Sequence, residues 1–288
     1  MPKCRAMPTL TELNSDQWID PDSVDRSVVT YWAQMVEIGA IEREPHTHKK
    51  GQIIFVQRGA LSCEVEGSLW MVPPRSAIWI PGHAVHAIKG LRIEGYNAFI
   101  ATDAARDLPS TCCALSVTPL LRELLIRSAS LPLLYEEAGA SSRMVTVMLD
   151  EIARAQVESL HLPMPIDGRL REVVKQMMAS PSTRGTMEFW ADRAGMSGRT
   201  FARLIERETG MSFGRWRQQL GIMLAVKWMA EGAAIQQVAS DLGYESVPSF
   251  ITMFRRALGV PPGRYMAERH PDRYPSSGRR VRNKSPFV

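Results

Sequence analysis

Four side chains in the first third of the chain have the types and the spacing of a metal or ligand site. His46 and His48 stand two residues apart, so in a β-strand both side chains point to one face. Gln52 follows four residues later, and His86 comes after the pair Pro81-Gly82. Imidazole suits divalent transition metals, whereas the amide of Gln52 cannot neutralise a cation as a carboxylate does. The residues predict either a divalent transition metal held by His46, His48 and His86 or a small ligand bound by all four.

Two further interpretations of this region stay open. The histidines can be surface and core residues with no joint role, in which case the chain needs no cofactor there. Trp79 is a ligand-binding candidate because its ring could stack on a ligand, although the core of a β structure is the favoured place for it.

A second group of chemically active residues is cationic and lies in the C-terminal half. Arg199, Arg203 and Arg207 recur every four residues, which places them on one face of a helix, opposite an apolar face. The outward positions of a second such helix are Pro248, Thr252, Arg255 and Arg256. An apolar face holds a helix on its own bundle and leaves a basic face free for the major groove of DNA. The alternative is a solvated helix with arginines on its outer surface.

The two helices belong to a supersecondary unit that the sequence contains twice, between Glu188 and Arg264. The matching pairs are Ala191 and Ala239, Gly195 and Gly243, Ser197 and Ser246, Phe201 and Phe250, and Gly210 and Gly259. In each copy a helix ends at a glycine that can take the left-handed conformation, and a serine can cap the next helix. This repetition favours two DNA-binding helix-turn-helix units over two solvated helices.

Residues 187 to 266 resemble the tandem helix-turn-helix domain of the AraC/XylS family of bacterial transcription regulators. The matching motifs are Ser197-x-Arg199-Thr200-Phe201-x-Arg203, Gly210-Met211-Ser212, Ala239-x-Asp241-Leu242-Gly243-Tyr244, Ser249-Phe250-x-x-x-Phe254-Arg255-Arg256 and Gly259-Val260-Pro261-Pro262-x-x-Tyr265. The resemblance implies seven helices, with two recognition helices in successive major grooves. The DNA-binding candidates are Ser197, Gly198, Arg199, Thr200, Arg203, Arg207, Ser246, Val247, Pro248, Ser249, Thr252, Arg255 and Arg256.

The N-terminal half is expected to be a different domain, built of strands. Short apolar runs broken by Gly and Pro between residues 28 and 110 indicate a β-sandwich or barrel. The histidine pattern resembles the two cupin motifs, whose side chains converge inside a jelly-roll barrel and often hold a divalent metal. In this chain Gln52 occupies the carboxylate position. The expected fold is therefore multi-domain, with an all-β cupin-like barrel followed by an all-α tandem helix-turn-helix domain.

The remaining segments are assigned from local patterns. Helical spacing from Pro119, and in a helix expected from Arg143 to about Leu160 with a cap at Ser141 or Ser142, predicts a dimerisation or packing segment. The two prolines at 163 and 165 indicate an interdomain linker. The expected ranges are an N-terminal segment at 1–27, the barrel at 28–110, the helical segment at 118–162, the linker at 163–166, the DNA-binding domain at 167–268 and a disordered basic tail at 269–288.

Charge and composition support this division. Residues 1–166 hold 15 Lys+Arg and 19 Asp+Glu, whereas residues 167–288 hold 20 and 11, so the C-terminal half suits a polyanion. The sequence has no apolar run long enough for a membrane span and no secretory signal, and a cytoplasmic protein is expected. The four cysteines form no disulfide or zinc framework, although the adjacent Cys112 and Cys113 leave a redox sensor as an alternative.

The sequence thus predicts a DNA-binding transcription regulator, not an enzyme, that senses a small-molecule effector through its barrel. The expected partners are double-stranded promoter DNA, the effector, RNA polymerase and a second copy of the chain in a homodimer, with no membrane. Whether it activates or represses stays open. One alternative is a cupin-type metal-dependent enzyme with an accessory helical domain. Another is a DNA-binding protein whose barrel only dimerises.

Overall fold

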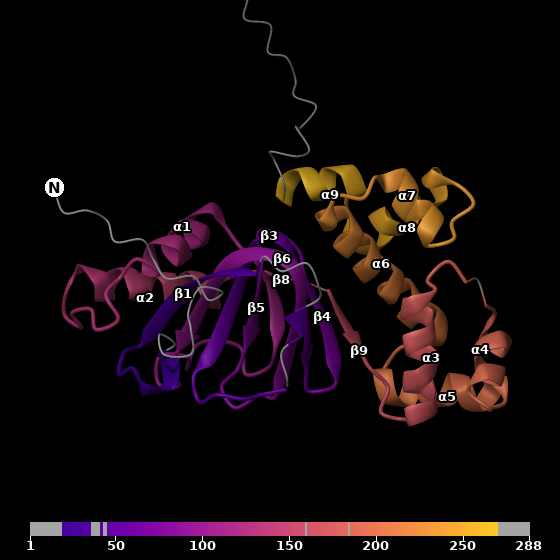
Figure 1. Ribbon diagram of the computed structural model, residues 1–288, viewed down its shortest axis with the longest axis horizontal. Coiled ribbons are helices and arrows are strands. Elements are labelled where there is room, and N and C mark those ends of the chain that lie inside the picture. Colours follow the sequence, from indigo (N-terminus) through magenta and orange to yellow (C-terminus); the bar gives the residue numbers. More distant parts are fainter. Residues whose placement is uncertain (1–18, 36–40, 43–44, 159, 184, 270–288) are drawn as a thin grey trace, which may run out of the picture.

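The computed structural model describes residues 19–35, 41–42, 45–158, 160–183 and 185–269. It has a sheet with two helices on one side and a bundle of helices on the other (Figure 1). The strands are β1 (Val28–Met35), β2 (Ile41–Glu42), β3 (Gly51–Val65), β4 (Ser68–Val72), β5 (Ser76–Ile80), β6 (His86–Ile100), β7 (Cys113–Ser116), β8 (Val157–Glu158) and β9 (His161–Pro163). The helices are α1 (Pro119–Ser128), α2 (Ala140–Ala153), α3 (Gly168–Ala179), α4 (Met187–Arg193), α5 (Gly198–Thr209), α6 (Phe213–Glu231), α7 (Ile235–Asp241), α8 (Val247–Leu258) and α9 (Pro262–Arg269).

The sheet is antiparallel and is organised around two long strands, β3 and β6. The main order is β1-β6-β3-β5-β7-β8, with β2 on β6, and β4 between β3 and β9. The first part of β3 pairs with β5 and the second part with β4, while β6 follows both parts. The register between β3 and β6 shifts between Val56 and Ala60. Because such bulges bend a strand, the sheet curls there and its inner side chains form one cluster that includes Ile54, Leu61 and Ile80.

The expected barrel is not closed. Among the described strands, those at the ends of the main path, β1 and β8, do not pair with each other. The sheet curves because β3 bends, and it does not close because no edge-to-edge ladder joins the two ends. The all-β domain followed by an all-α domain is nevertheless as the sequence predicts.

The outer face of the sheet is covered by α1 and α2 (Figure 1). Thr118 caps α1 by accepting a hydrogen bond from the Leu121 amide at 3.1 Å. The predicted extent of the next helix was wrong at both ends. It begins after Gly139 without a side-chain cap and ends at Ala153, not near Leu160. Beyond it the chain extends and forms β8 and β9, because open edges of β7 and β4 offer backbone partners there.

The predicted linker is also only partly a linker. Pro163 belongs to β9, which pairs with β4, and the Met164 amide donates to the Gly67 carbonyl at 2.9 Å. Pro163 and Pro165 cannot donate a hydrogen bond, so they are tolerated at this edge and in the following turn. The sheet therefore extends past residue 110 and holds the chain almost to the start of α3.

The described part of the helical half, α3 to α9, contains seven helices, as the family resemblance implies. Asp167 caps α3 by accepting from the amides of Arg169 and Leu170. The long helix α6 is buried on most sides, because it lies between two smaller helical units and also touches β3 and β9. Its core is shared with the sheet, since Ala60, Met71 and Leu162 join the same apolar cluster as Trp216 and Met223.

None of the helices in the described ranges combines the length and the apolar character that crossing a bilayer requires.

Candidate nucleic-acid interface and histidine cluster

The first helix-turn-helix unit consists of α4, a short turn and α5. Gly195 in the turn has φ +64°, in the left-handed region that the sequence predicted for a helix end. Ser197 then caps α5 by accepting a hydrogen bond from the Thr200 amide at 3.3 Å. The buried side of α5 carries Phe201 and Ile205, and the Phe201 ring meets Phe213 of α6 edge to face at 5.2 Å. The opposite side is left for solvent or a ligand.

The second unit, α7 to α9, repeats this construction with more aromatic residues. Gly243 has φ +77°, and Ser246 accepts a hydrogen bond from the Ser249 amide at 3.3 Å. Under α8 the rings of Tyr244, Phe250, Phe254 and Tyr265 follow one another with centroid separations of 5.5, 5.8 and 5.5 Å. Edge-to-face contacts of this kind add to the area that each ring buries. They fix which side of α8 faces outward.

The predicted DNA-binding side chains lie on the outer sides of α5 and α8. Half-buried positions are Gly198, Thr200 and Val247, and the exposed ones are Ser197, Arg199, Arg203, Arg207, Ser246, Pro248, Ser249, Thr252, Arg255 and Arg256. Within the described ranges, Arg199, Arg203, Arg255 and Arg256 make no ion pair with another side chain. Their guanidinium groups are therefore not engaged within the described chain.

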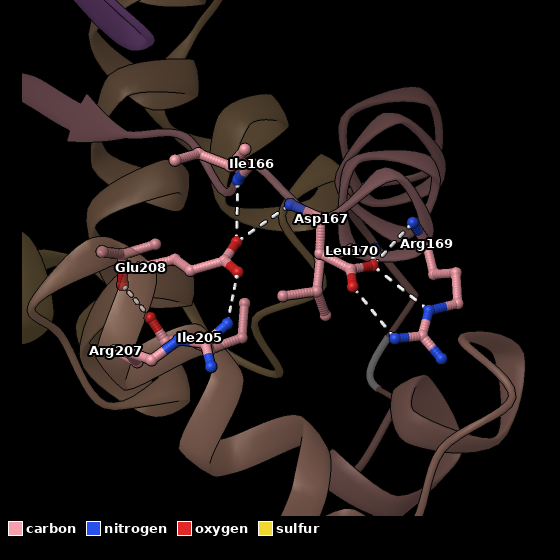
Figure 2. Close-up of polar contacts among 8 residues, drawn as sticks. Ile166, Asp167, Arg169, Leu170, Ile205, Arg207 and Glu208 are labelled. Atoms are coloured by element: carbon pink, nitrogen blue, oxygen red, sulfur yellow. Dashed lines mark hydrogen bonds and ion pairs between the residues drawn. The ribbon is translucent and has the colours of Figure 1, made fainter.

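Arg207 differs from the other arginines because it pairs with its neighbour Glu208 at 3.1 Å. Figure 2 shows the second role of Glu208, whose Oε2 accepts hydrogen bonds from the amides of Ile166 and Asp167 at 2.8 and 3.0 Å. Partial burial opposes the charge of Glu208, but the two amides and Arg207 outweigh it and hold its pKa below the usual value. Through Glu208, Arg207 thus supports residues 160–167, which connect β8 to α3 and are called the connecting segment below. The sequence pattern did not indicate this role.

The structure brings His46, His48 and His86 together. The ring centroids of His46 and His86 are 4.3 Å apart, those of His48 and His86 5.0 Å, and those of His46 and His48 6.1 Å. One ring nitrogen from each histidine lies within 4.8 Å of the other two. A backbone bridge between His46 and His86 fixes their relative position. The three imidazoles therefore lie close together, as the resemblance to cupins implies.

Hydrogen bonds orient two of these rings. His48 Nδ1 donates to the Lys50 carbonyl at 2.5 Å, and His86 Nδ1 donates to the Ala84 carbonyl at 2.9 Å. In a neutral ring the proton on Nδ1 leaves the lone pair on Nε2. His48 Nε2 lies 3.1 Å from Gln52 Oε1, and the Gln52 amide continues to Asn97 Oδ1 at 3.2 Å. If the side-chain amides of Gln52 and Asn97 are both rotated by about 180°, the hydrogen bond between them is kept. The NH₂ group of Gln52 then donates to the lone pair on His48 Nε2.

Trp79 does not join the cluster. Its strand neighbour Ile80 pairs with Gln52, so Trp79 points to the opposite face of the sheet. It is buried in the outer core beneath α1 and α2, and its Nε1 donates to the Pro109 carbonyl at 2.7 Å. This position agrees with a core role and contradicts its inclusion among the ligand-binding residues.

The chain is similar to several known proteins. A family model described as a helix-turn-helix domain matches residues 190–268. The regulator NimR of Escherichia coli K12 is 40% identical over 222 residues, which cover 77% of this chain and 81% of NimR. The E. coli activator RclR is 24% identical, with 76% and 86% covered. A crystal structure of ToxT from Vibrio cholerae aligns with a TM-score of 0.36 at 14% identity, over 84% of this chain and 98% of that one.

The chain belongs to the AraC/XylS family of transcription regulators. It is a DNA-binding regulator of transcription. The relatives are regulators and not enzymes, which decides against the cupin-enzyme alternative.

The histidine cluster of this AraC/XylS member fits a divalent transition metal in its donor set. Three imidazoles suit zinc, copper, iron or nickel, and ligating histidines usually donate their other ring N–H to a carbonyl or carboxylate. His48 and His86 both do so. The ring nitrogens lie within 4.8 Å of one another, whereas ligand atoms of a zinc ion with bonds of about 2.0 Å would lie roughly 3.3 Å apart, so binding would draw the rings closer together. Gln52 adds no charge to the site.

Asn97 and Phe99 of β6 also border the cluster, and the sequence analysis missed both. Asn97 is 7% exposed and bonded to Gln52, and the ring of Phe99 lies 5.2 Å from His48. An asparagine directly before the apolar run Ala98-Phe99-Ile100 is the signal that could have identified Asn97, because a buried amide needs a hydrogen-bond partner. Phe99 carries no comparable signal, because a phenylalanine in a strand normally indicates core.

The described thiols do not have the properties of a redox sensor. Burial raises the pKa of Cys63 to about 12 and that of Cys113 to about 11, and it raises the pKa of Cys112 as well. Because the thiolate is the reactive species, these cysteines are expected to react slowly near neutral pH. Cys4 lies outside the described residues.

The substitution Glu208→Gln should lower the free energy of unfolding by about 1–3 kcal/mol at pH 7, because two amides lose a charged acceptor. Glu208 has a depressed pKa in the folded state. Its contribution should therefore be complete above the ordinary glutamate pKa of about 4.3 and disappear as the pH falls through the lower folded-state value. Urea unfolding at pH 7 and in acid measures this difference. Glu206→Gln on the same helix is the control, and an equal loss in both variants would contradict the assignment.

Proposed function

We propose that this regulator reads promoter DNA with the first turns of α5 and α8. Arg199, Thr200 and Arg203 would meet base edges in one major groove, with Gly198 allowing close approach. Arginine pairs bidentately with guanine, and the N-terminus of a helix attracts phosphate. The observation that carries the proposal is the exposure of Arg199 and Arg203 on the side of α5 opposite its buried Phe201 and Ile205.

The second recognition helix would read its groove with a different set of residues. Ser246, Val247, Ser249 and Thr252 would approach bases, with Pro248 beside them at the start of the helix. The methyl groups of Val247 and Thr252 suit a thymine methyl. Arg255 and Arg256 lie in the last turn and would contact phosphates. Helix α6 has 19 residues and is about 28 Å long. This length supports a separation of the two recognition helices close to the spacing of successive major grooves, about 34 Å.

Arginine substitutions on the two helices should have different effects on DNA binding. Arg203→Ala should cost about 1–3 kcal/mol on the preferred site and relax the preference at one base pair, because a base contact is lost. Arg256→Ala should weaken binding to all sequences, because a phosphate contact is lost. The slope of log K against log salt concentration should become smaller in magnitude by about one. Fluorescence anisotropy over a salt series, with single-base variants of the site, measures both. If each variant merely unfolds the domain, the assignment is wrong.

We also propose that the histidine cluster is the effector site and that a divalent transition metal, alone or with a small ligand, occupies it. His46, His48 and His86 would hold the ion, while Gln52 and Asn97 would bind whatever completes its coordination. The convergence of three ring nitrogens within 4.8 Å supports this proposal. Gln52 is 1% exposed, so its amide is held in a fixed position at the site.

His48→Ala should reduce zinc affinity at least tenfold, because one of three donors is removed. Isothermal titration of the full chain with Zn²⁺ measures the affinity, and circular dichroism checks the fold. His83→Ala is the matched control, since His83 is an exposed histidine of the same half. Equal affinity in the wild type, His48→Ala and His83→Ala would show that the metal binds elsewhere or only nonspecifically, and the effector would then be a metal-free ligand.

A homodimer and a contact with RNA polymerase complete the proposed function. Leu120 in α1, Leu134 between α1 and α2, and Val147 in α2 are 52, 66 and 45% exposed. Helices α1 and α2 lie on the side of the sheet away from the helical half (Figure 1). Exposed apolar groups of this kind are typical of a protein interface. The full chain should therefore sediment as a dimer, and a monomer at micromolar concentration would exclude this interface. Promoter binding in bacteria would place the protein in the cytoplasm.

A further inference from the structure

The two helix-turn-helix units are attached to the sheet in different ways. The first unit is anchored through the connecting segment and α6. Trp216 Nε1 donates to the Pro163 carbonyl at 2.7 Å, and Gln219 Nε2 donates to the His161 carbonyl at 3.1 Å. Glu208 adds its bonds to the amides of Ile166 and Asp167. These contacts are directed at the backbone of one continuous segment, so the position of α5 relative to the sheet is fixed at several points.

The second unit reaches the sheet mainly through the end of α9. Arg269 Nη2 donates to Glu158 Oε1 on β8 at 2.5 Å, and the two side chains are only 16 and 13% exposed. Arg75 Nη1 also donates to the Glu268 carbonyl at 3.2 Å, from an exposed position. We call the pair of Glu158 and Arg269 the α9 clamp.

The α9 clamp is in contact with the support of the recognition helix. The guanidinium of Arg269 lies 3.8 Å from the centre of the Tyr265 ring. Tyr265 meets Phe254 edge to face, and Phe254 is one of the fully buried residues beneath α8. A displacement of Arg269 would therefore act directly on the aromatic cluster that sets the outward face of α8.

On the sheet side, the α9 clamp connects to the strand that borders the histidine cluster. Ser76 Oγ donates to Glu158 Oε2 at 3.3 Å. Ser76 begins β5, and Ile80 at the other end of this strand pairs with Gln52. All five residues of β5 are buried, so the strand is a short rigid connection between the two places.

Some hydrogen-bonding groups in and next to the α9 clamp have no partner. Nε of Arg269 and the hydroxyl of Tyr265 are buried without a hydrogen-bond partner within the described part of the chain. A buried donor without an acceptor costs free energy. The ion pair therefore holds the arrangement against an opposing cost.

We propose that Glu158 and Arg269 are positioning residues for DNA reading, because their ion pair fixes the second helix-turn-helix unit relative to the first. The proposal rests on the proposed reading of DNA by both α5 and α8. With the clamp closed, α8 is oriented before it meets DNA. With the clamp open, the second unit can turn about its connection to α6. DNA binding must then order this unit, and the entropy cost lowers the affinity. The α5 half of the site is unaffected, because its anchors are separate.

The test uses the full-length protein and an operator selected from a random duplex library with the wild type. Two further duplexes are derived from this operator. In one, the bases in the groove read by α5 (the α5 box) are scrambled, and in the other, those in the groove read by α8 (the α8 box). Dissociation constants are measured for the wild type, Glu158→Gln, Arg269→Gln and the double variant. Arg264→Gln is the matched control, because Arg264 forms an exposed pair with Glu268 on the same helix. Thermal unfolding of each variant accompanies the binding measurements.

The clamp predicts a selective effect. Scrambling the α8 box should weaken wild-type binding at least tenfold but weaken either single variant less than threefold, while the α5 box keeps its full effect in all proteins. The double variant should resemble the singles, because both substitutions remove the same contact. Equal loss at both boxes, additive losses or tighter binding by the variants would overturn the proposal. A wild type that does not depend on both boxes would instead overturn the proposed mode of DNA reading.

Discussion

The segment from Leu160 to Asp167 has to satisfy hydrogen-bonding groups of two domains at once, and the arrangement of the molecule depends on it. On the sheet side, the Leu160 carbonyl accepts from Met71 and the Met164 amide donates to Gly67. On the helical side, Trp216 and Gln219 donate to the carbonyls of Pro163 and His161, and Glu208 accepts from the amides of Ile166 and Asp167. Few backbone groups of this segment are left for water, so it cannot behave as a flexible tether. The start of α3 is consequently fixed against the edge of the sheet.

The parts of the fold that depend on neighbours in sequence could be predicted, whereas parts that depend on distant partners could not. Gly195, Ser197 and Phe201 act within one turn of each other, so their spacing was sufficient to indicate the unit and its repeat. Helix α2 was predicted to run to about Leu160 because the residues beyond Ala153 carry no strong stop signal. They form strands because β7 and β4, about 45 and 90 residues earlier in the chain, have open edges there.

The candidate sites show the same limit. His46 and His48 share a strand face by simple alternation, and the resemblance to cupins linked them to His86. The face of the sheet that Trp79 occupies depends on the register between β5 and β3, which is a property of pairing and not of local sequence. Asn97 is joined to Gln52 over 45 residues, and Glu158 to Arg269 over 111 residues. An asparagine next to an apolar run hints at the first contact, whereas no local pattern marks the second.

The inner side of the curled sheet is filled by its own aliphatic side chains, including Val56, Leu61 and Ile78, each at most 1% exposed. The inner side of the sheet therefore leaves little space in which ligands could be distinguished by their size. On the proposal that the histidine cluster binds the effector, ligands would be distinguished by their affinity for the imidazole nitrogens and the amide groups of Gln52 and Asn97. On the same proposal, exchanging Gln52 or Asn97 during evolution would change which effector is recognised while the aliphatic core stays intact, so related proteins could acquire new specificities without losing the fold.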